Sequence, residues 1–263
     1  MCGRYILTSP ATELRAAFNV SPQSLPEHVQ FPPRYNIAPS QPIGVVIEEG
    51  GARHFRLMRW GLIPAWVKDP RSFTLLINAR SETAAAKPSF RDALRYRRCL
   101  VPANGYYEWQ SIAGRKRSFA ILPPGGDLFA FAGLYETWTG AHGEEMDSVA
   151  ILTIAASPDL ASLHDRMPVV IPPHAHERWL NCRDHPASNI KDLLKPSAPG
   201  TFSFHEVSNA VSNPSHDDPR LIAALPPSSR VQDDEGAQMA APSTIQAVRK
   251  PRKRADDNQG SLF

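Results

Sequence analysis

The strongest constraint on the fold of this chain is a succession of short strand-like runs that turn residues interrupt. The 26 prolines and the Glu49-Gly50-Gly51 turn separate these runs without a fixed repeat. Antiparallel pairing of neighbouring runs is the expected result. The runs are Gly3 to Thr8, Ile43 to Glu49, His54 to Trp60, Phe73 to Ala79, Ser118 to Leu122, Leu128 to Trp138, Val149 to Ala155 and Phe202 to Ser208.

A few short helices accompany the predicted strands. Ser9-Pro10 is typical of a helix start, and Ser89 with Asp92 forms a capping-box pattern. Further short helices are expected over His174 to Leu180 and Asn189 to Leu194. We therefore predict an α+β fold, with a single domain of curled, mainly antiparallel, barrel-like β-sheets and short helices at its periphery.

The composition of the chain changes near residue 226. Hydrophobic residues make up 42% of the 263 residues, which is enough for one large core. After Leu225 the chain is rich in Ser, Pro, Asp, Gln and Ala, so burial cannot offset its conformational entropy there. We predict a folded domain over residues 1–225 and a flexible, disordered tail over residues 226–263.

Charge and cysteine content narrow the class of protein. The net charge is only +3, so any nucleic-acid-binding face must be local. The three cysteines lack CxxC spacing, which argues against a disulfide framework and a structural zinc site. There is no apolar signal region and no run of 18 apolar residues. We expect a cytoplasmic monomer that uses no membrane, metal or other cofactor.

The start of the chain, Met1-Cys2-Gly3, is the most informative stretch for function. Removal of the initiator methionine would leave Cys2 with a free α-amine beside its thiol. These groups titrate at roughly 7.7–8.0 and roughly 8.5, so both are nucleophiles near neutral pH. With an aldehyde, the pair can form an imine and close to a thiazolidine ring. The alternative is that Cys2 packs as a small apolar residue.

Seven motifs in order along the chain resemble one family. They are Met1-Cys2-Gly3-Arg4-Tyr5, Arg34-Tyr35-Asn36-Ile37-Ala38-Pro39, Arg59-Trp60-Gly61-Leu62-Ile63-Pro64, Asn78-Ala79-Arg80-Ser81-Glu82-Thr83, Arg98-Cys99-Leu100-Val101-Pro102, Gly105-Tyr106-Tyr107-Glu108-Trp109 and His164-Asp165-Arg166-Met167-Pro168. Together they resemble the SOS-response-associated peptidase family, the abasic-site processing proteins. Seven motifs over roughly 220 residues are far more specific than any one of them.

The resemblance implies an active site around the N-terminal cysteine and a positively charged groove for single-stranded DNA. It implies that Cys2 crosslinks to the aldehyde of an abasic site and that Asn78 orients the amine and the sugar. It also implies that Glu108 transfers protons during sugar-ring opening and that His164 handles the sugar hydroxyl and the imine. The crosslink would protect the lesion during replication-associated repair, and lyase activity is a further expectation. Taken singly, Asn78 and His164 could instead serve a loop or a turn, and Glu108 could be an exposed strand charge.

Residues beside these catalytic candidates are predicted to contact DNA. Two arginines adjoin the cysteine and the asparagine and suit phosphates, while two tryptophans offer flat faces to unpaired bases. The alternatives for them are surface ion pairs and core packing. A proline and a serine are assigned to the groove on the resemblance alone. The predicted DNA contacts are Arg4, Pro39, Ser40, Trp66, Arg80 and Trp109.

Three other functions are compatible with parts of the sequence. Glutamine amidotransferases also begin with Met-Cys-Gly, but they commonly place His-Asn-Gly downstream, whereas Asn104-Gly105 here follows Ala103. The family name indicates a thiol autopeptidase that removes a leader, although only Met1 precedes the cysteine. A non-covalent single-strand-binding protein, in which Cys2 is incidental, is the third.

The end of the tail resembles the sliding-clamp-binding peptide of bacterial replication and repair proteins. Gln259, Leu262 and Phe263 supply the glutamine and the two terminal apolar residues of that peptide. We therefore expect a bacterial sliding clamp as a partner and a position at the nucleoid during repair. The alternative is a chance ending, with the basic run Arg249 to Arg254 acting as a loose phosphate tether.

Overall fold

The computed structural model describes residues 2–26 and 28–226, and Met1–Leu225 form one compact unit. The strands are β1 (Tyr5–Leu7), β2 (Arg34–Ile37), β3 (Pro42–Glu49), β4 (Ala52–Trp60), β5 (Asn78–Arg80), β6 (Arg98–Ala103), β7 (Gly105–Ile112), β8 (Arg115–Leu122), β9 (Phe129–Thr139), β10 (Glu145–Ala155), β11 (Arg166–Pro168) and β12 (Ser203–Val207). The α-helices are α1 (Ala11–Phe18), α2 (Ser81–Ala84), α3 (Pro88–Tyr96) and α4 (His176–Leu180). Short 3-10 helices are η1 (Pro124–Gly126), η2 (Pro173–Ala175), η3 (Ala187–Leu193), η4 (Asn209–Ser212) and η5 (Pro219–Ile222).

Five strands of the larger sheet close into a ring. The order is β10, β4, β3, β6 and β9, and β9 pairs with β10 again. Strands β5 and β11 add to the ring by pairing with β10. The pairings are antiparallel except those of β10 with β4 and β5. The predicted barrel-like, mainly antiparallel α+β fold is therefore confirmed, and closure leaves the ring strands without a free edge.

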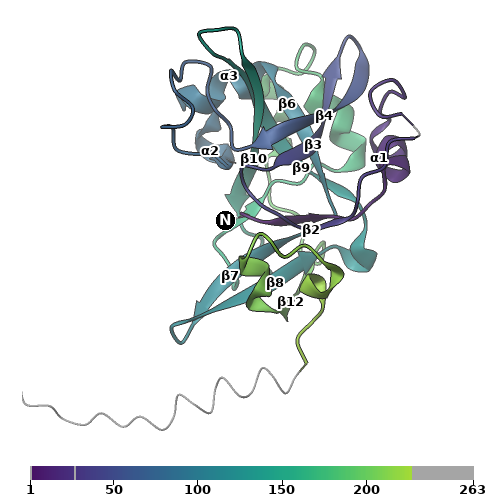
Figure 1. Cartoon of the computed structure of the whole chain (residues 1–263), viewed down its shortest axis with the longest axis vertical. Helices are drawn as coiled ribbons and strands as arrows, with labels where there is room; N and C mark the ends of the chain where they lie inside the picture. The colour runs from purple at the N-terminus through teal and green to yellow at the C-terminus, as the bar shows by residue number, and fades with distance from the viewer. Residues whose placement is uncertain (1, 27, 227–263) are drawn as a thin grey trace, which may run out of the picture. The chain divides into compact units, whose positions relative to one another are not determined.

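The second sheet places the start of the chain next to the barrel. Its order is β12, β8, β7, β1 and β2, so β1 is an inner strand that pairs on both sides. Figure 1 shows β7, β8 and β12 at the end of the domain opposite α3 and β4, with the beginning of the chain between them. This arrangement brings the residues before β1 close to strands of both sheets.

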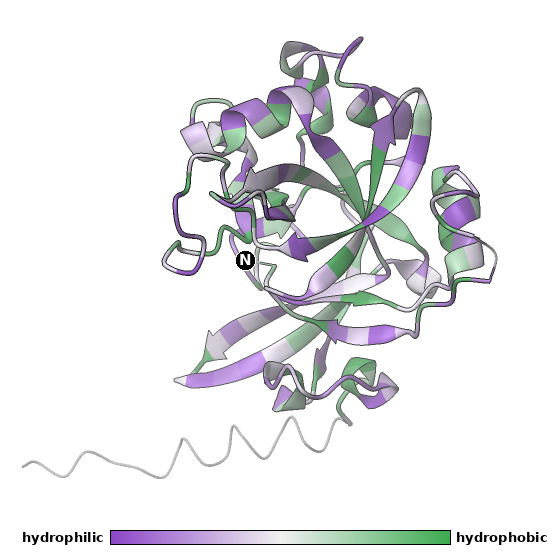
Figure 2. Cartoon of the chain, turned by 45° about the horizontal axis from the view of Figure 1, so that its top comes forward, coloured by the Kyte–Doolittle hydropathy of each residue, from purple (hydrophilic) through white to green (hydrophobic). Residues whose placement is uncertain are grey.

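Apolar side chains of the strands form the core. Figure 2 shows hydrophobic residues concentrated along the barrel strands. One buried cluster contains Trp60 and Phe131 of the barrel together with Tyr5 of β1 and Cys2, which precedes β1. A second cluster packs the helices α1, α3 and α4 against the barrel. The helices therefore lie at the periphery, as the sequence predicts.

One predicted strand is largely wrong. Of the segment Phe73 to Ala79, only the last two residues are in a strand, β5, which starts at Asn78. Upstream, the Ser72 and Phe73 amides bond back to the carbonyls of Asp69 and Pro70, so the backbone turns there instead of extending. The predicted helix caps also differ, because neither α1 nor α3 has a side-chain cap hydrogen bond.

Within residues 2–26 and 28–226, no helix is long and apolar enough to cross a membrane. Of the predicted tail, only Pro226 belongs to the described residues, and Gln259, Leu262 and Phe263 lie outside them.

Candidate functional site

Cys2 is buried at the entrance to β1. Its exposed fraction is 0%, and its Sγ lies 3.8 Å from the carbonyl oxygen of Arg4. β1 pairs with β7 through Tyr5 and Tyr106, and the Tyr107 amide donates to the Arg4 carbonyl at 3.0 Å. The strand pairing therefore holds the first residues of the domain in one position.

Asn78 reaches this segment from the barrel side. It opens β5, where it pairs with Ile151 of β10. Its Nδ2 donates to the carbonyl oxygen of Cys2 at 2.9 Å. Its Oδ1 is buried and has no hydrogen-bond partner among the described residues. Asn78 thus fixes the backbone of Cys2 and retains one acceptor for a bound group.

Glu108 approaches Cys2 from β7. Its exposed fraction is 3%. Burial raises the pKa of Glu108 above its ordinary value, and neighbouring positive charge, including that of His164, opposes the rise only in part. Burial also raises the pKa of the Cys2 thiol well above its usual range, and the Glu108 charge adds to this effect. The two groups are therefore close enough to influence each other, and burial shifts both toward their protonated forms.

His164 lies in the turn between β10 and β11. Its Nδ1 is 2.9 Å from the Arg166 amide, which donates to it, and 2.8 Å from Oδ1 of Asp165. The Asp165 side chain is 84% exposed, so the backbone amide is the better-defined partner. We assign the proton of the neutral ring to Nε2 on this basis. In its protonated form His164 lowers the pKa of Glu108, so Cys2, Asn78, Glu108 and His164 lie in one neighbourhood.

Arg4 is held by protein groups. Its guanidinium donates to Oδ1 of Asn36 and to the carbonyl of Val211, both at 2.8 Å, and to the carbonyl of Ser212 at 3.1 Å. The buried Asn36 in turn donates to carbonyls of residues 211, 213 and 216. These contacts support an anchoring role for Arg4, which connects the N-terminal segment to residues 209–216.

The other predicted DNA contacts vary in exposure. Arg80 is exposed where β5 meets α2. Trp66 is 61% exposed, with its ring edge-on to Phe73. Trp109 donates to Oγ of Ser212 at 3.1 Å and lies under the ammonium group of Lys116.

The turn after β2 carries the last two predicted contacts. Pro39 is half-buried and Ser40 is exposed. Ser40 adopts a left-handed backbone conformation with φ 69°, and its amide donates to the carbonyl of Trp60 at 2.8 Å. The turn is therefore fixed to the end of β4, and Ser40 presents its side chain at the surface.

Sequence reasoning missed two polar pairs that support the site. Arg166 makes a two-point ion pair with Glu82, at 2.7 and 2.9 Å, and also donates to the Thr153 carbonyl at 2.6 Å. Asn36, which holds Arg4, is the other. Both pairs, Arg166 with Glu82 and Arg4 with Asn36, join residues of two different family motifs. Complementary polar residues in separate motifs were the sequence signal that could have predicted these pairs.

Asn104, which the amidotransferase alternative would require near the nucleophile, is engaged elsewhere. Its Oδ1 accepts from the amides of Thr8 and Ser9, and its Nδ2 donates to Oγ of Ser9 and to the Gly126 carbonyl. All four bonds tie loops together. The structure therefore gives Asn104 a structural role, which weakens that alternative.

The chain is similar to several known proteins. Abasic site processing protein YoqW of Bacillus subtilis (strain 168) is 38% identical over 223 residues, which cover 84% of this chain and 99% of that protein. Abasic site processing protein HMCES of Gallus gallus is 29% identical over 265 residues, which cover 86% of this chain and 78% of that protein. A crystal structure of a Bacteroides thetaiotaomicron protein superposes with a TM-score of 0.73 at 25% identity, over 85% of this chain and 100% of that chain. Residues 1–214 match the family described as SOS response associated peptidase (SRAP), and the chain belongs to this family.

Proposed function

We propose that this protein recognises abasic sites in single-stranded DNA and forms a covalent crosslink to them through Cys2. The observation that carries the proposal is the burial of Cys2 between the amide of Asn78 and the buried carboxyl of Glu108. The names of the relatives as abasic site processing proteins support the substrate. The crosslink would shield the lesion during replication-associated repair.

The chemistry begins once Met1 has been removed. Glu108 moves a proton between the ring oxygen and the hydroxyl of the deoxyribose, which opens the sugar to its aldehyde. The Cys2 amine adds to the aldehyde carbon, and the resulting carbinolamine loses one water to give an imine. The thiol then adds to the imine carbon while its proton passes to the nitrogen, so the net change is a thiazolidine and one water.

The environment of Cys2 favours the amine as the first nucleophile. Burial raises the pKa of the thiol, so the thiolate is scarce near neutral pH. The scarcity of thiolate raises the barrier to attack by the sulfur. An imine carbon held beside the sulfur lowers that barrier, because proton transfer and carbon–sulfur bond formation occur within one site. Glu108, with its raised pKa, and His164 are the groups suited to carry the protons.

A gel assay tests the proposal. The purified protein is mixed with an oligonucleotide that contains one abasic site, and a shifted band that survives denaturation is expected. Cys2→Ala should abolish this band, whereas Cys99→Ser and Cys182→Ser, which change the other two free thiols, should retain it. A Cys2→Ala variant that crosslinks at the wild-type rate would refute the proposal, and reversible binding alone would favour a non-covalent single-strand binder.

Lyase chemistry is the second activity that this site supports. An imine at C1′ makes the proton at C2′ acidic, and its loss expels the 3′ phosphate by β-elimination. Thiazolidine closure competes with this route, because it removes the imine. Cys2→Ser keeps the amine but has a weaker second nucleophile, so it should give more strand cleavage and a borohydride-reducible adduct. Absence of both products would remove the lyase proposal.

A further inference from the structure

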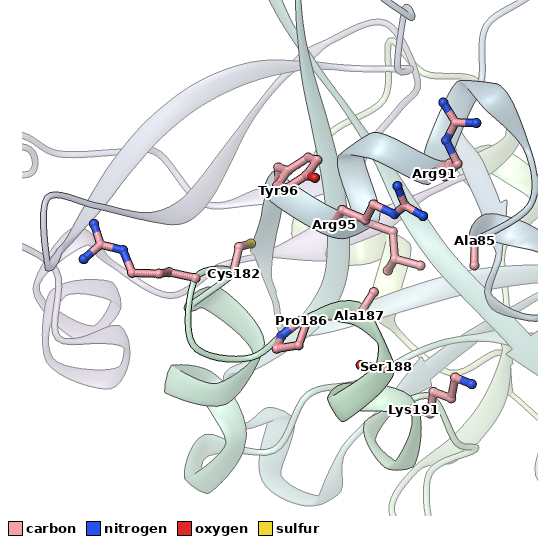
Figure 3. Close-up of a pocket in the computed structure, with 11 residues that line it drawn as sticks. Ala85, Arg91, Arg95, Tyr96, Cys182, Pro186, Ala187, Ser188 and Lys191 are labelled. Carbon is pink, nitrogen blue, oxygen red and sulfur yellow. The ribbon is translucent and has the colours of Figure 1, made fainter.

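A cavity of about 770 Å³ lies away from Cys2, between α3 and the segment that runs from Cys182 to Lys191. Figure 3 shows Arg91, Arg95 and Tyr96 on the α3 side and Pro186, Ala187 and Ser188 on the other. Its volume lies within the range of about 300–1,000 Å³ that is usual for small-ligand sites. The cavity is thus large enough for a nucleotide unit.

The lining of this cavity is cationic. It contains four cationic side chains and no carboxylate: Arg91, Arg95, Arg183 and Lys191. Arg91 pairs with Asp92 at 3.0 Å, with both side chains 46% exposed. Arg95, Arg183 and Lys191 have no ion pair with a carboxylate among the described residues, and all three are exposed. A phosphate group is the chemistry that such a lining suits.

An aromatic face accompanies the charge. Tyr96, the last residue of α3, is 65% exposed, although large apolar side chains are usually covered. Its ring lines the same cavity as Arg95 and Arg183. Cationic groups beside an uncovered aromatic ring are the combination with which proteins bind unpaired nucleotides, because phosphates contact the cations and bases stack on the ring.

Buried Arg98 holds the two walls of the cavity in place. Its guanidinium, only 1% exposed, donates to the Leu94 carbonyl on the α3 side at 3.3 Å. It also donates to the carbonyls of Trp179, Asn181 and His185 at 2.6, 3.2 and 2.7 Å. These acceptors flank Cys182 and Arg183. The cavity is therefore preorganised, which reduces the entropic cost of binding.

The cavity also connects to the candidate active site along the chain. Arg80 is followed directly by α2, and Ala85, the residue after α2, lines the cavity. Five residues of helix rise about 8 Å. A strand that passes Arg80 on its way from Cys2 can therefore reach the cavity within a few nucleotides.

We propose that this cavity binds one nucleotide unit of the single strand that extends from the abasic site, with its phosphate at Arg95, Arg183 and Lys191 and its base on Tyr96. The inference rests on the proposed function for the origin of the strand. It adds a second anchoring point, separate from the crosslinking residues, that would set how the strand runs across the domain.

Fluorescence anisotropy with a labelled, undamaged oligothymidylate tests this inference. Arg95→Ala and Arg183→Ala should each weaken binding about fivefold and lower the salt slope by about 0.7. Tyr96→Ala should weaken binding without changing the slope, whereas Tyr96→Phe should bind like the wild type. Arg220→Ala is the matched control, because Arg220 is 89% exposed on η5 and pairs with Asp218. It should leave binding unchanged.

Comparing strand binding with abasic-site crosslinking separates a failure of the cavity assignment from a failure of the proposed function. If Arg95→Ala, Arg183→Ala and Tyr96→Ala all bind oligothymidylate like the wild type, the inference is wrong, even if the Cys2 crosslink forms. If they bind weakly while no abasic crosslink appears with any protein, the cavity assignment stands and the proposed function falls. Binding of thymidine monophosphate and of inorganic phosphate to the wild-type protein is measured as well. If thymidine monophosphate binds as tightly as the strand, the cavity is a free-nucleotide site and the strand assignment is overturned.

Discussion

The side-chain amide of Asn78 donates to the backbone carbonyl of Cys2 across 2.9 Å, and so links the barrel to the start of the chain. The two residues are 76 positions apart; Asn78 opens β5, which pairs with β10, and Cys2 precedes β1 of the second sheet. Because the bond acts on the backbone of Cys2, it restricts the position of the amine without occupying the amine or the thiol.

Replacing Asn78 should therefore slow crosslinking more than it weakens DNA binding. Asn78→Ala removes both the donor to Cys2 and the unpartnered acceptor, and we expect a rate at least tenfold lower, equivalent to about 1.4 kcal/mol. Gel quantification at saturating DNA gives the rate. Asn189→Ala, which changes an exposed asparagine whose side chain accepts from Ser188, is the control. Equal rates for the two variants would mean that the Asn78 bond does not position Cys2.

Glu108→Gln should slow crosslinking and increase stability at neutral pH. Burial raises the folded-state pKa of Glu108 above 4.5, so the folded protein binds more protons than the unfolded chain between those two values. The contribution of Glu108 to the free energy of unfolding therefore falls as the pH rises from 4.5 through its folded-state pKa. Glutamine does not ionise, so the variant does not lose this stability. Urea unfolding at about pH 4 and about pH 7.5 should show a gain for the variant only at the higher pH. A gain of equal size at both values would contradict this assignment.

Arg80→Ala should separate binding from chemistry. Arg80 is exposed beside Asn78, and its side chain has no hydrogen bond within the described part of the chain. We expect weaker binding of undamaged single strands, a salt slope lower by about 0.7, and an unchanged crosslinking rate at saturating DNA. Glu108→Gln should instead slow crosslinking at saturating DNA and leave the binding of undamaged single strands unchanged. Similar losses of affinity in both variants would remove the distinction between the two roles.

His176 should make the fold sensitive to acid. It is buried, stacks on Phe18 with ring centroids 5.2 Å apart, and has a pKa lowered by burial from 6.5 to about 4. Stability is lost as the pH falls through this window, by up to about 3 kcal/mol. His176→Leu should flatten the dependence of unfolding free energy on pH there, whereas His142→Leu, at an exposed position, should not. An unchanged pH profile for His176→Leu would be evidence against this source.

A peptide covering Ala255 to Phe263 should bind the bacterial sliding clamp at around the micromolar level, about 8 kcal/mol. The apolar end would fill a pocket on the partner, and tethering would raise the local concentration of the repair domain. Calorimetry with the isolated clamp measures the affinity. Changing Leu262 and Phe263 to Ala should remove binding and leave crosslinking by the full chain intact. No heat from the wild-type peptide at high concentration would end the proposal.

The sequence predicted the fold class because alternation and turn residues are local signals. The hairpin of β3 and β4 follows directly from the apolar runs on either side of Gly50 and Gly51, both of which have positive φ. β6 and β7 were not predicted. Arg98 opens β6 with a charge and Glu108 interrupts the apolar pattern of β7, and groups distant in the sequence compensate both charges: the Trp179 carbonyl for Arg98 and His164 for Glu108. Such compensation cannot be read from local spacing.

The candidate site was likewise predictable from the sequence only in part. Cys2, Asn78, Glu108 and His164 were named from motifs, and the structure places them near one another. The motifs did not reveal that Arg4 faces Asn36 and backbone carbonyls, because a sequence neighbour of Cys2 can point to either side of a strand. The role of Arg4 depends on a segment more than 200 residues away.

That long-range contact has a consequence for biosynthesis. The acceptors that hold Arg4 and Asn36 come from residues 211–216, near the end of the domain. Until residues 211–216 have been synthesised, the carbonyls that hold Arg4 and Asn36 are missing, so the segment around Cys2 cannot reach the arrangement that it has in the folded domain. The order of synthesis thus delays the assembly of the proposed active site until residues 211–216 have joined the fold.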